Sequence, residues 1–226
     1  MFWLLVTAIA TSIHGFSMEA QLTMCASLME PPQIQFEQPL EDVEVQYGDS
    51  VTLFCSVYGA PQAAIKWLHR GRVVASYSAP VVESALHTTR IASGLIESRH
   101  HIPCVNRKTL GEYTCEATSP CGEVISSTAF VSLSNSVRAK SSCNVSSNAI
   151  APTIAVTTVS RLELAGSPVQ LMCRASGVPK PMIVLSNGDL LVVADSWVTT
   201  ESYRCSARNP SGVMVADSTI VYVDES

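Results

Sequence analysis

The sequence predicts an all-β protein built from two tandem sandwiches, of which the second is truncated. The stretch "VTLFC" at residues 51–55 places apolar side chains at every second position, which directs them to one face of a strand. The same spacing recurs in "VQLMC" at residues 169–173, so the strand pattern is repeated. Eight cysteines, an even number, predict a framework of disulfides.

The first copy carries further marks at fixed distances from its cysteines. Trp67 follows Cys55 by twelve residues, and Tyr113 precedes Cys115 by two. A turn at residues 119–122 then leads into an alternating strand. This order of features resembles an immunoglobulin domain of the I-set type. The resemblance implies that Cys55 and Cys115 bridge the two sheets. It also implies that Trp67 packs on this bridge and that the Tyr113 hydroxyl bonds back to the turn before its strand.

The second copy repeats the cysteines but shortens the interval between them. Tyr203 precedes Cys205 by two residues, and the resemblance implies a bridge from Cys205 to Cys173. In the first copy 60 residues separate the two cysteines, whereas here only 32 do.

Two interpretations of the short interval compete. In one, Leu185 replaces the tryptophan of the third strand, strand C of this family, and the later strands are cut short. In the other, residues 182–193 are already the hairpin of strands D and E, and strand C is absent. We favour the second, which implies that a segment is missing through splicing or an error in the gene model.

More particular marks relate the chain to one family. A cysteine precedes "VNRKTLGEYTC" (Cys104), another lies in "AKSSCNVSS" (Cys143), and "LSNGDLLVV" leads to Trp197. With these marks the chain resembles the zwei-Ig proteins, a nematode family of small secreted proteins with two immunoglobulin domains. That family is implicated in holding axons in position after the nervous system has formed. It is similar to an insect secreted protein that binds insulin-like peptides.

The ends of the chain complete the predicted organisation. An apolar run at residues 2–13, followed by small residues, predicts a signal peptide cleaved after Ser17. No later run approaches the 18 residues of a membrane span, so we expect a secreted protein without a membrane anchor. The expected divisions are a signal peptide (1–17), an N-terminal segment (18–31), domain 1 (32–134), a linker (135–150) and domain 2 (151–226).

Four cysteines remain, and sandwich geometry separates them. Cys25 and Cys121 lie at the end of domain 1 that holds its N-terminus, whereas Cys104 and Cys143 lie at the other end. Because a disulfide needs its Cα atoms within about 7 Å, pairs along the length of the domain are excluded. We predict bridges Cys25–Cys121 and Cys104–Cys143; free cysteines or a covalent dimer are the alternative.

One glycosylation sequon adjoins the linker cysteine. Asn144, Val145 and Ser146 form it, and a glycan on Asn144 would shield the linker from proteases. An unused sequon is the alternative.

The residues predict binding rather than catalysis. The five histidines are scattered, no nucleophile or phosphate-binding motif accompanies them, and no Cys-x-x-Cys pair joins His100, His101 and Cys104. We therefore expect no enzyme activity, no cofactor and no metal. The net charge of -5 is thinly spread, which argues against nucleic acid and anionic membranes as partners.

Extracellular proteins are the expected partners. Residues 77–101 are long enough for two edge strands that could pair with another chain. The hairpin "HRGR" at residues 69–72 is a second candidate contact, against the simpler interpretation of a solvated turn. The resemblance implies an adhesion-type binding module of neural surfaces, whose partner is a cell-surface adhesion protein or an immunoglobulin-domain receptor. The alternative is a carrier that sequesters insulin-like peptides, which a groove between the domains would favour.

Overall fold

The computed structural model describes Cys25, residues 32–78, 93–134, Cys143, and residues 149–184, 189–192 and 199–223. The predicted signal peptide, Asn144, Leu185 and Trp197 lie outside these residues. The elements within them are strands, which confirms the all-β class. Domain 1 is the group β1–β8: β1 (Gln33–Gln38), β2 (Val43–Val45), β3 (Val51–Ala60), β4 (Ala64–His69), β5 (Arg72–Tyr77), β6 (Gly94–Ile102), β7 (Gly111–Thr118) and β8 (Val124–Leu133).

Domain 2 is the group β9–β15, which starts one residue before the expected boundary. Its strands are β9 (Ile150–Thr158), β10 (Arg161–Leu164), β11 (Val169–Val178), β12 (Met182–Ile183), β13 (Asp189–Val192), β14 (Thr199–Asn209) and β15 (Gly212–Val223). In each domain a short strand, β2 or β10, runs parallel to the last strand, β8 or β15. The two domains therefore repeat one sandwich topology.

Alternation along the strands creates the core of domain 1. In β3, Leu53 and Cys55 are buried, whereas the intervening Phe54 is 42% exposed. The buried residues face β4 and β7 of the second sheet, whose order is β2-β8-β7-β4-β5. A period of two thus converts the sequence pattern directly into an inner and an outer face.

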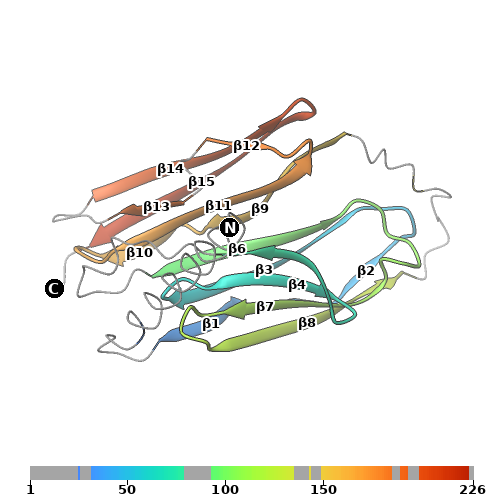
Figure 1. Ribbon diagram of the computed structural model, residues 1–226, viewed down its shortest axis with the longest axis horizontal. Helices are drawn as coiled ribbons and strands as arrows, with labels where there is room; N and C mark the ends of the chain where they lie inside the picture. Colours follow the sequence, from blue (N-terminus) through green and yellow to red (C-terminus); the bar gives the residue numbers. More distant parts are fainter. Residues whose placement is uncertain are drawn as a thin grey trace, which may run out of the picture.

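One six-stranded sheet runs through both domains. Its order is β1-β3-β6-β9-β11-β13, so β9 of domain 2 lies beside β6 of domain 1 (Figure 1). The pairing is antiparallel and sets Ser98 opposite Val156. In domain 1, β9 therefore occupies the place beside β6 where another strand of the same sandwich would lie.

The two sandwiches use opposite faces of this shared sheet. Val156 lies opposite Ser98, and both side chains belong to the interior of domain 1. Thr157 follows Val156 in β9 and therefore faces the other side of the sheet. Cys173 lies opposite Thr157, so the Cys173 side chain also points to that side, where it is bridged to Cys205. Figure 1 shows the result, with the second sheet of domain 1 below the shared sheet and that of domain 2 above it.

The prediction that domain 2 lacks strand C is wrong. Residues Met182 and Ile183 form β12, which pairs with β14 on the side away from β15. Ile183 lies opposite Ala207 just as Ile65 of strand β4 lies opposite Ala117. A short strand C is therefore present in the register found in domain 1.

The prediction that residues 182–193 form a hairpin of strands D and E is also wrong. β12 belongs to the sheet of β14, whereas β13 pairs with β11 in the shared sheet. β12 lies at one end of the domain and β13 toward the other, and both run in the same direction. One passage of the chain, divided between the two sheets, thus connects Cys173 to Cys205. A hairpin would have returned the chain to the wrong end, which is why the shorter connection prevails.

Candidate interaction surfaces

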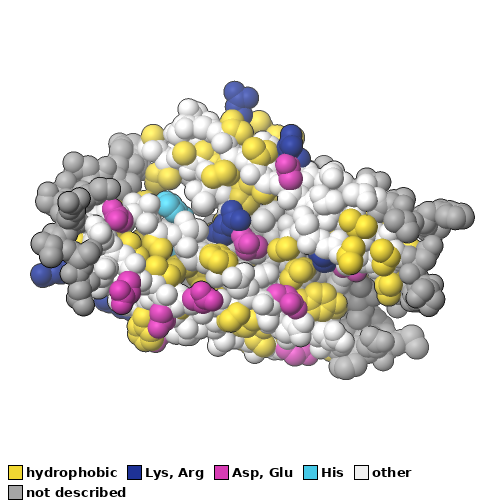
Figure 2. Space-filling view, turned by 180° about the vertical axis from the view of Figure 1, so that it is seen from behind, with side chains coloured by type: hydrophobic (Ala, Val, Ile, Leu, Met, Phe, Trp, Pro, Cys, Tyr) yellow, Lys and Arg dark blue, Asp and Glu magenta, His cyan; other side chains and the backbone are white. Residues whose placement is uncertain are grey.

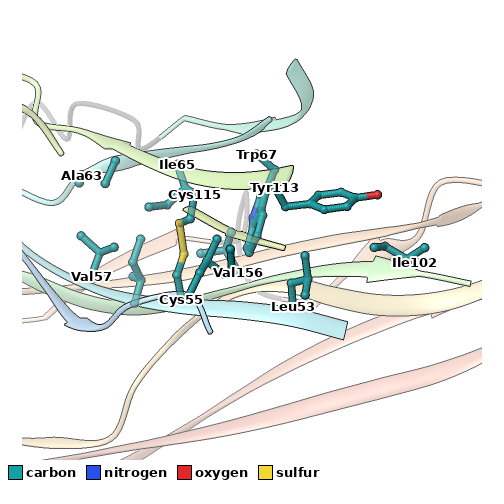
Figure 3. Close-up of a cluster of buried hydrophobic side chains, with 14 of the residues drawn as sticks. Leu53, Cys55, Val57, Ala63, Ile65, Trp67, Ile102, Tyr113, Cys115 and Val156 are labelled. Carbon is teal, nitrogen blue, oxygen red and sulfur yellow. A yellow bond between two sulfur atoms is a disulfide. The ribbon is translucent and has the colours of Figure 1, made fainter. Parts of the chain in front are cut away.

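The predicted marks of domain 1 meet around its central disulfide (Figure 3). Cys55 and Cys115 are bridged, with their Cα atoms 6.7 Å apart. Trp67 is fully buried, and its Nε1 donates a hydrogen bond to Ser98 Oγ at 2.9 Å. The Tyr113 hydroxyl donates to a backbone carbonyl oxygen four residues earlier, at 2.9 Å. These residues hold the two sheets together, so they build the scaffold rather than a binding face.

Domain 2 has the equivalent disulfide but a smaller core. Cys173 and Cys205 are bridged with Cα atoms 6.1 Å apart, and the half-buried Tyr203 packs against a separate apolar cluster. A small pocket, partly open to solvent and with room for about one water molecule, is lined by both cysteines, Tyr203 and Leu171. In domain 1 the corresponding residues surround Trp67. The pocket thus lies against the Cys173–Cys205 bridge, whereas in domain 1 Trp67 packs into the cluster that contains Cys55 and Cys115.

The two remaining bridges join the predicted pairs. Cys25 is bridged to Cys121 and Cys104 to Cys143, with Cα separations of 5.6 and 5.8 Å. Asn106 reinforces the second bridge, because its Nδ2 donates to the Cys104 carbonyl oxygen at 3.3 Å. The bridge attaches Cys143, which lies between β8 and β9, to the end of domain 1.

The two domains are also joined by hydrogen bonds from side chains of domain 1 to residues of domain 2. Ser98, which accepts from Trp67, donates to the Ala155 carbonyl oxygen at 3.2 Å. Gln62, 1% exposed, donates to Met172 Sδ at 2.9 Å. Val156 and Met172 both belong to the buried cluster of domain 1. Domain 2 therefore completes the core of domain 1.

A second set of contacts surrounds Ser93 at the start of β6. Its carbonyl oxygen accepts hydrogen bonds from the Gln170 amide at 3.1 Å and from Arg161 Nη2 at 3.2 Å. The Ser93 hydroxyl donates to Glu163, which also pairs with Arg161. A groove between the domains was the expected support for a peptide carrier. Paired strands and buried side chains occupy the part of that junction around β6 and β9.

His100 belongs to β6, and its half-buried side chain faces the interior of the sandwich. Its ring stacks on Trp67, with centroids 5.5 Å apart, and lies 5.7 Å from the ring of Tyr113. Burial and, to a smaller extent, the neighbouring His101 and His69 together lower the pKa of His100 to about 4. Within the described ranges no three His, Cys, Asp or Glu side chains are grouped to hold a metal ion.

Acidification will destabilise the protein through His100. Its folded-state pKa lies below the ordinary value of 6.5, so the unfolded chain binds the proton first and stability falls as the pH drops from about 6.5 to 4. The loss is at most about 3 kcal/mol, and we expect about 2 kcal/mol because the ring keeps some access to solvent. Urea unfolding at pH 7.5 and 4.5 measures it.

Two variants test whether His100 causes this loss of stability at low pH. The ring of His100→Phe can keep the stack on Trp67 without titrating, so most of the loss should disappear. His101→Gln alters the exposed neighbour, which contacts Thr52 Oγ1 at 2.9 Å, and should keep the loss. Equal pH dependence in His100→Phe and in the unmodified protein would refute the assignment.

The predicted hairpin at residues 69–72 connects two neighbouring strands of domain 1. Arg70 and Gly71 form the turn between β4 and β5 with φ angles of 49° and 74°, and Arg70 Nη2 donates to the Leu110 carbonyl oxygen at 2.8 Å. This confirms the hairpin. Of the predicted edge segment, residues 79–92 lie outside the described part of the chain. The rest of the segment includes β6, which pairs with β9 and therefore offers no unpaired edge on that side.

Both domains carry ion pairs and exposed apolar side chains on their outer faces, including Val73, Val124 and Phe130 of domain 1. On domain 1, Lys66 pairs with Glu116 across β4 and β7 at 3.2 Å. Figure 2 shows Asp and Glu side chains gathered over the lower half of the molecule, which is domain 1. On domain 2, Met182, Val184 and Val213 are each exposed by more than half. The described residues form no helix of the length and apolar character needed to cross a membrane.

The paired cysteines, the buried tryptophan and the parallel short strands define an immunoglobulin-domain protein. The family model of the immunoglobulin I-set domain matches residues 34–132. Zwei Ig domain protein zig-3 of Caenorhabditis elegans is 32% identical over 206 residues, covering 82% of this chain and 79% of the relative. Zig-2 of the same organism is 27% identical over 84% of this chain and 85% of its own length. The chain belongs to the zwei Ig domain family.

A solved structure has the same fold. The crystal structure of neural ectodermal development factor IMP-L2 aligns with a TM-score of 0.57 and 24% identity, covering 87% of this chain and 97% of that one. The alignment extends over both domains.

Proposed function

We propose that the protein acts outside the cell, as a secreted binding protein that helps to keep axons in position through contacts with other extracellular proteins. Membership of the zwei Ig domain family is the observation that carries this proposal. Four disulfides support it, because such bridges persist in oxidising compartments. Binding rather than catalysis suits a molecule in which Cys55, Cys115 and Trp67 serve to hold the two sheets of domain 1 together.

The junction indicates how such a protein would bind. Paired strands, buried side chains and the Cys104–Cys143 bridge fix the two domains against each other. A partner can therefore contact both domains without first ordering a flexible linker, which removes part of the entropic cost of binding. We expect the cell-surface partner to be an adhesion protein or an immunoglobulin-domain receptor.

Removal of the protein from the animal tests the neural role. Axon tracts should form normally and then shift from their positions as the animal grows and moves. Tracts that are misplaced from the outset, or that stay in place throughout life, would contradict the proposal.

A carrier of insulin-like peptides is the second candidate, favoured by the fold shared with IMP-L2. Titration of the purified protein with insulin-like peptides separates the two. Saturable binding at nanomolar concentration supports the carrier. Binding only to cell-surface domains, in a screen of extracellular domains, supports the adhesion-type function.

A further inference from the structure

The outer face of the β12-β14-β15 sheet carries an apolar patch at one end of domain 2. Met182, Arg208 and Val213 lie side by side in one row across the three strands. Val184, whose amide donates to the Ser206 carbonyl oxygen, and Val215, opposite Ser206, form the next row. The four apolar side chains are 65%, 58%, 63% and 51% exposed for Met182, Val213, Val184 and Val215. We call these four residues and Arg208 the β12 patch.

Within the described part of domain 2, no further strand extends the sheet beside this patch. In domain 1, β5 pairs with β4 and extends the corresponding sheet by one strand. Among the described strands of domain 2, β12 is the last in its sheet. Among the described residues the patch therefore ends at an unpaired strand edge, and exposed apolar side chains gathered at such an edge favour an interaction site.

Two basic residues accompany the patch, although the whole chain has a net charge of -5. Arg208 lies within it, and the exposed Lys180 precedes Met182 by two residues. No ion pair involving Arg208 or Lys180 occurs among the described residues. The nearest acidic side chain along the sheet, Asp217, is already paired with Arg204 at 2.7 Å. Figure 2 shows Lys and Arg among hydrophobic side chains over the upper half of the molecule, which is domain 2.

The loops beneath the patch are held in place. The Asn209 side chain, 8% exposed, donates from Nδ2 to the carbonyl oxygens of Ile150 at 2.8 Å and Pro179 at 3.0 Å. Its Oδ1 accepts from the Ser211 amide at 2.9 Å. Gly177 lies against the side-chain amide of Asn209, because a Cβ added to this glycine would be 3.1 Å from Asn209 Nδ2. The patch is thus presented by a preorganised surface, which lowers the cost of binding.

We propose that the β12 patch is a docking surface for an extracellular protein segment in which apolar side chains flank a carboxylate. The apolar side chains would cover Met182, Val184, Val213 and Val215, and the carboxylate would pair with Arg208. Met and Arg are residues that interfaces favour, and a central cation inside an apolar surface selects an acidic partner. The inference rests on the proposed function, that the protein acts by binding proteins.

A displayed library of random twelve-residue peptides probes the patch. The full chain is the bait, and the double variant Met182→Ser/Val213→Ser is the counter-selection. Peptides recovered from the unmodified chain should be enriched in Asp or Glu beside apolar residues. They should bind the double variant at least tenfold more weakly. Arg208→Gln should weaken the acidic peptides tenfold and leave their neutral analogues unchanged.

Matched changes on domain 1 provide the control. Val73→Ser/Val124→Ser removes two valines that are 58% and 57% exposed, and it should leave peptide binding unchanged. Recovery of no peptides, or of peptides that bind both double variants equally, would overturn the proposal. Dimers that dissociate in Met182→Ser/Val213→Ser would assign the patch to a second copy of the chain and overturn it too. A cell-surface partner that binds the patch variants normally would refute the docking site while leaving the proposed function intact.

Discussion

Replacing Val156 with Asp will unfold domain 1, although Val156 belongs to domain 2. The side chain is fully buried in the cluster that contains Trp67 and the Cys55–Cys115 bridge. An uncompensated carboxylate there costs several kcal/mol, which is comparable with the whole stability of a domain. Val156→Ala is the milder change and should lower the free energy of unfolding by about 2–3 kcal/mol, since it removes two methyl groups and leaves a cavity.

Fluorescence of Trp67 measures this effect in domain 1. A Trp197→Phe background removes the tryptophan of domain 2 from the signal, and urea unfolding gives the free energy. Val213→Ala removes the same atoms from a valine that is 58% exposed, and it should change stability by less than about 0.5 kcal/mol. If Val156→Ala were as mild as Val213→Ala, the completion of the domain 1 core by domain 2 would be refuted.

Trp67→Ala will lower the stability by about 3–5 kcal/mol, the range found when large aromatic side chains are removed from a core. Its indole is fully buried and donates to Ser98, which in turn bonds to the backbone of β9. The change therefore also leaves a polar group at the domain junction without its donor. Circular dichroism during urea unfolding measures the loss.

Phe130→Ala is the matched control for Trp67→Ala, since Phe130 is 52% exposed on the outer face of β8. We expect a change smaller than about 1 kcal/mol for it. Trp67→Leu copies the residue that follows Cys173 at the equivalent distance, and it should lie between the two. A stability of Trp67→Ala within 1 kcal/mol of the unmodified protein would contradict the role given to the indole.

The sequence predicted the parts of the fold that depend on short-range pattern. Alternating apolar residues around Cys55 and Cys173 identified the buried strands, because side chains in a strand alternate between its faces. The bridges Cys25–Cys121 and Cys104–Cys143 followed from which end of the sandwich each cysteine occupies, since a disulfide tolerates only short Cα separations.

The shared sheet could not be predicted in the same way. β6 and β9 are separated by two further strands and a linker, and their pairing uses backbone groups that any sequence supplies. The apolar β9 sequence signals burial, but it does not say against which strand. Val156 is a residue of β9 in domain 2, yet its side chain belongs to the core of domain 1.

The error over strand C has a physical cause. Strand number was inferred from segment length, on the assumption that each passage of the chain stays within one sheet. β12 and β13 share one passage between two sheets, so a segment too short for the usual strands still connects Cys173 to Cys205. The β12 patch depends on the same short strand, because it joins Met182 of β12 to side chains of β14 and β15.

Hydrogen exchange of the full chain tests the central claim most directly, namely that β6 and β9 hold the two domains as one body. The Val159 amide, which donates to the Leu95 carbonyl oxygen at 2.9 Å, and the amides of the β6–β9 ladder should exchange as slowly as those in the middle of β3 and β7. Their protection should disappear only with global unfolding. Exchange of this ladder at the rate of an exposed strand edge, while β3 and β7 stay protected, would show that the domains move independently and would contradict the account.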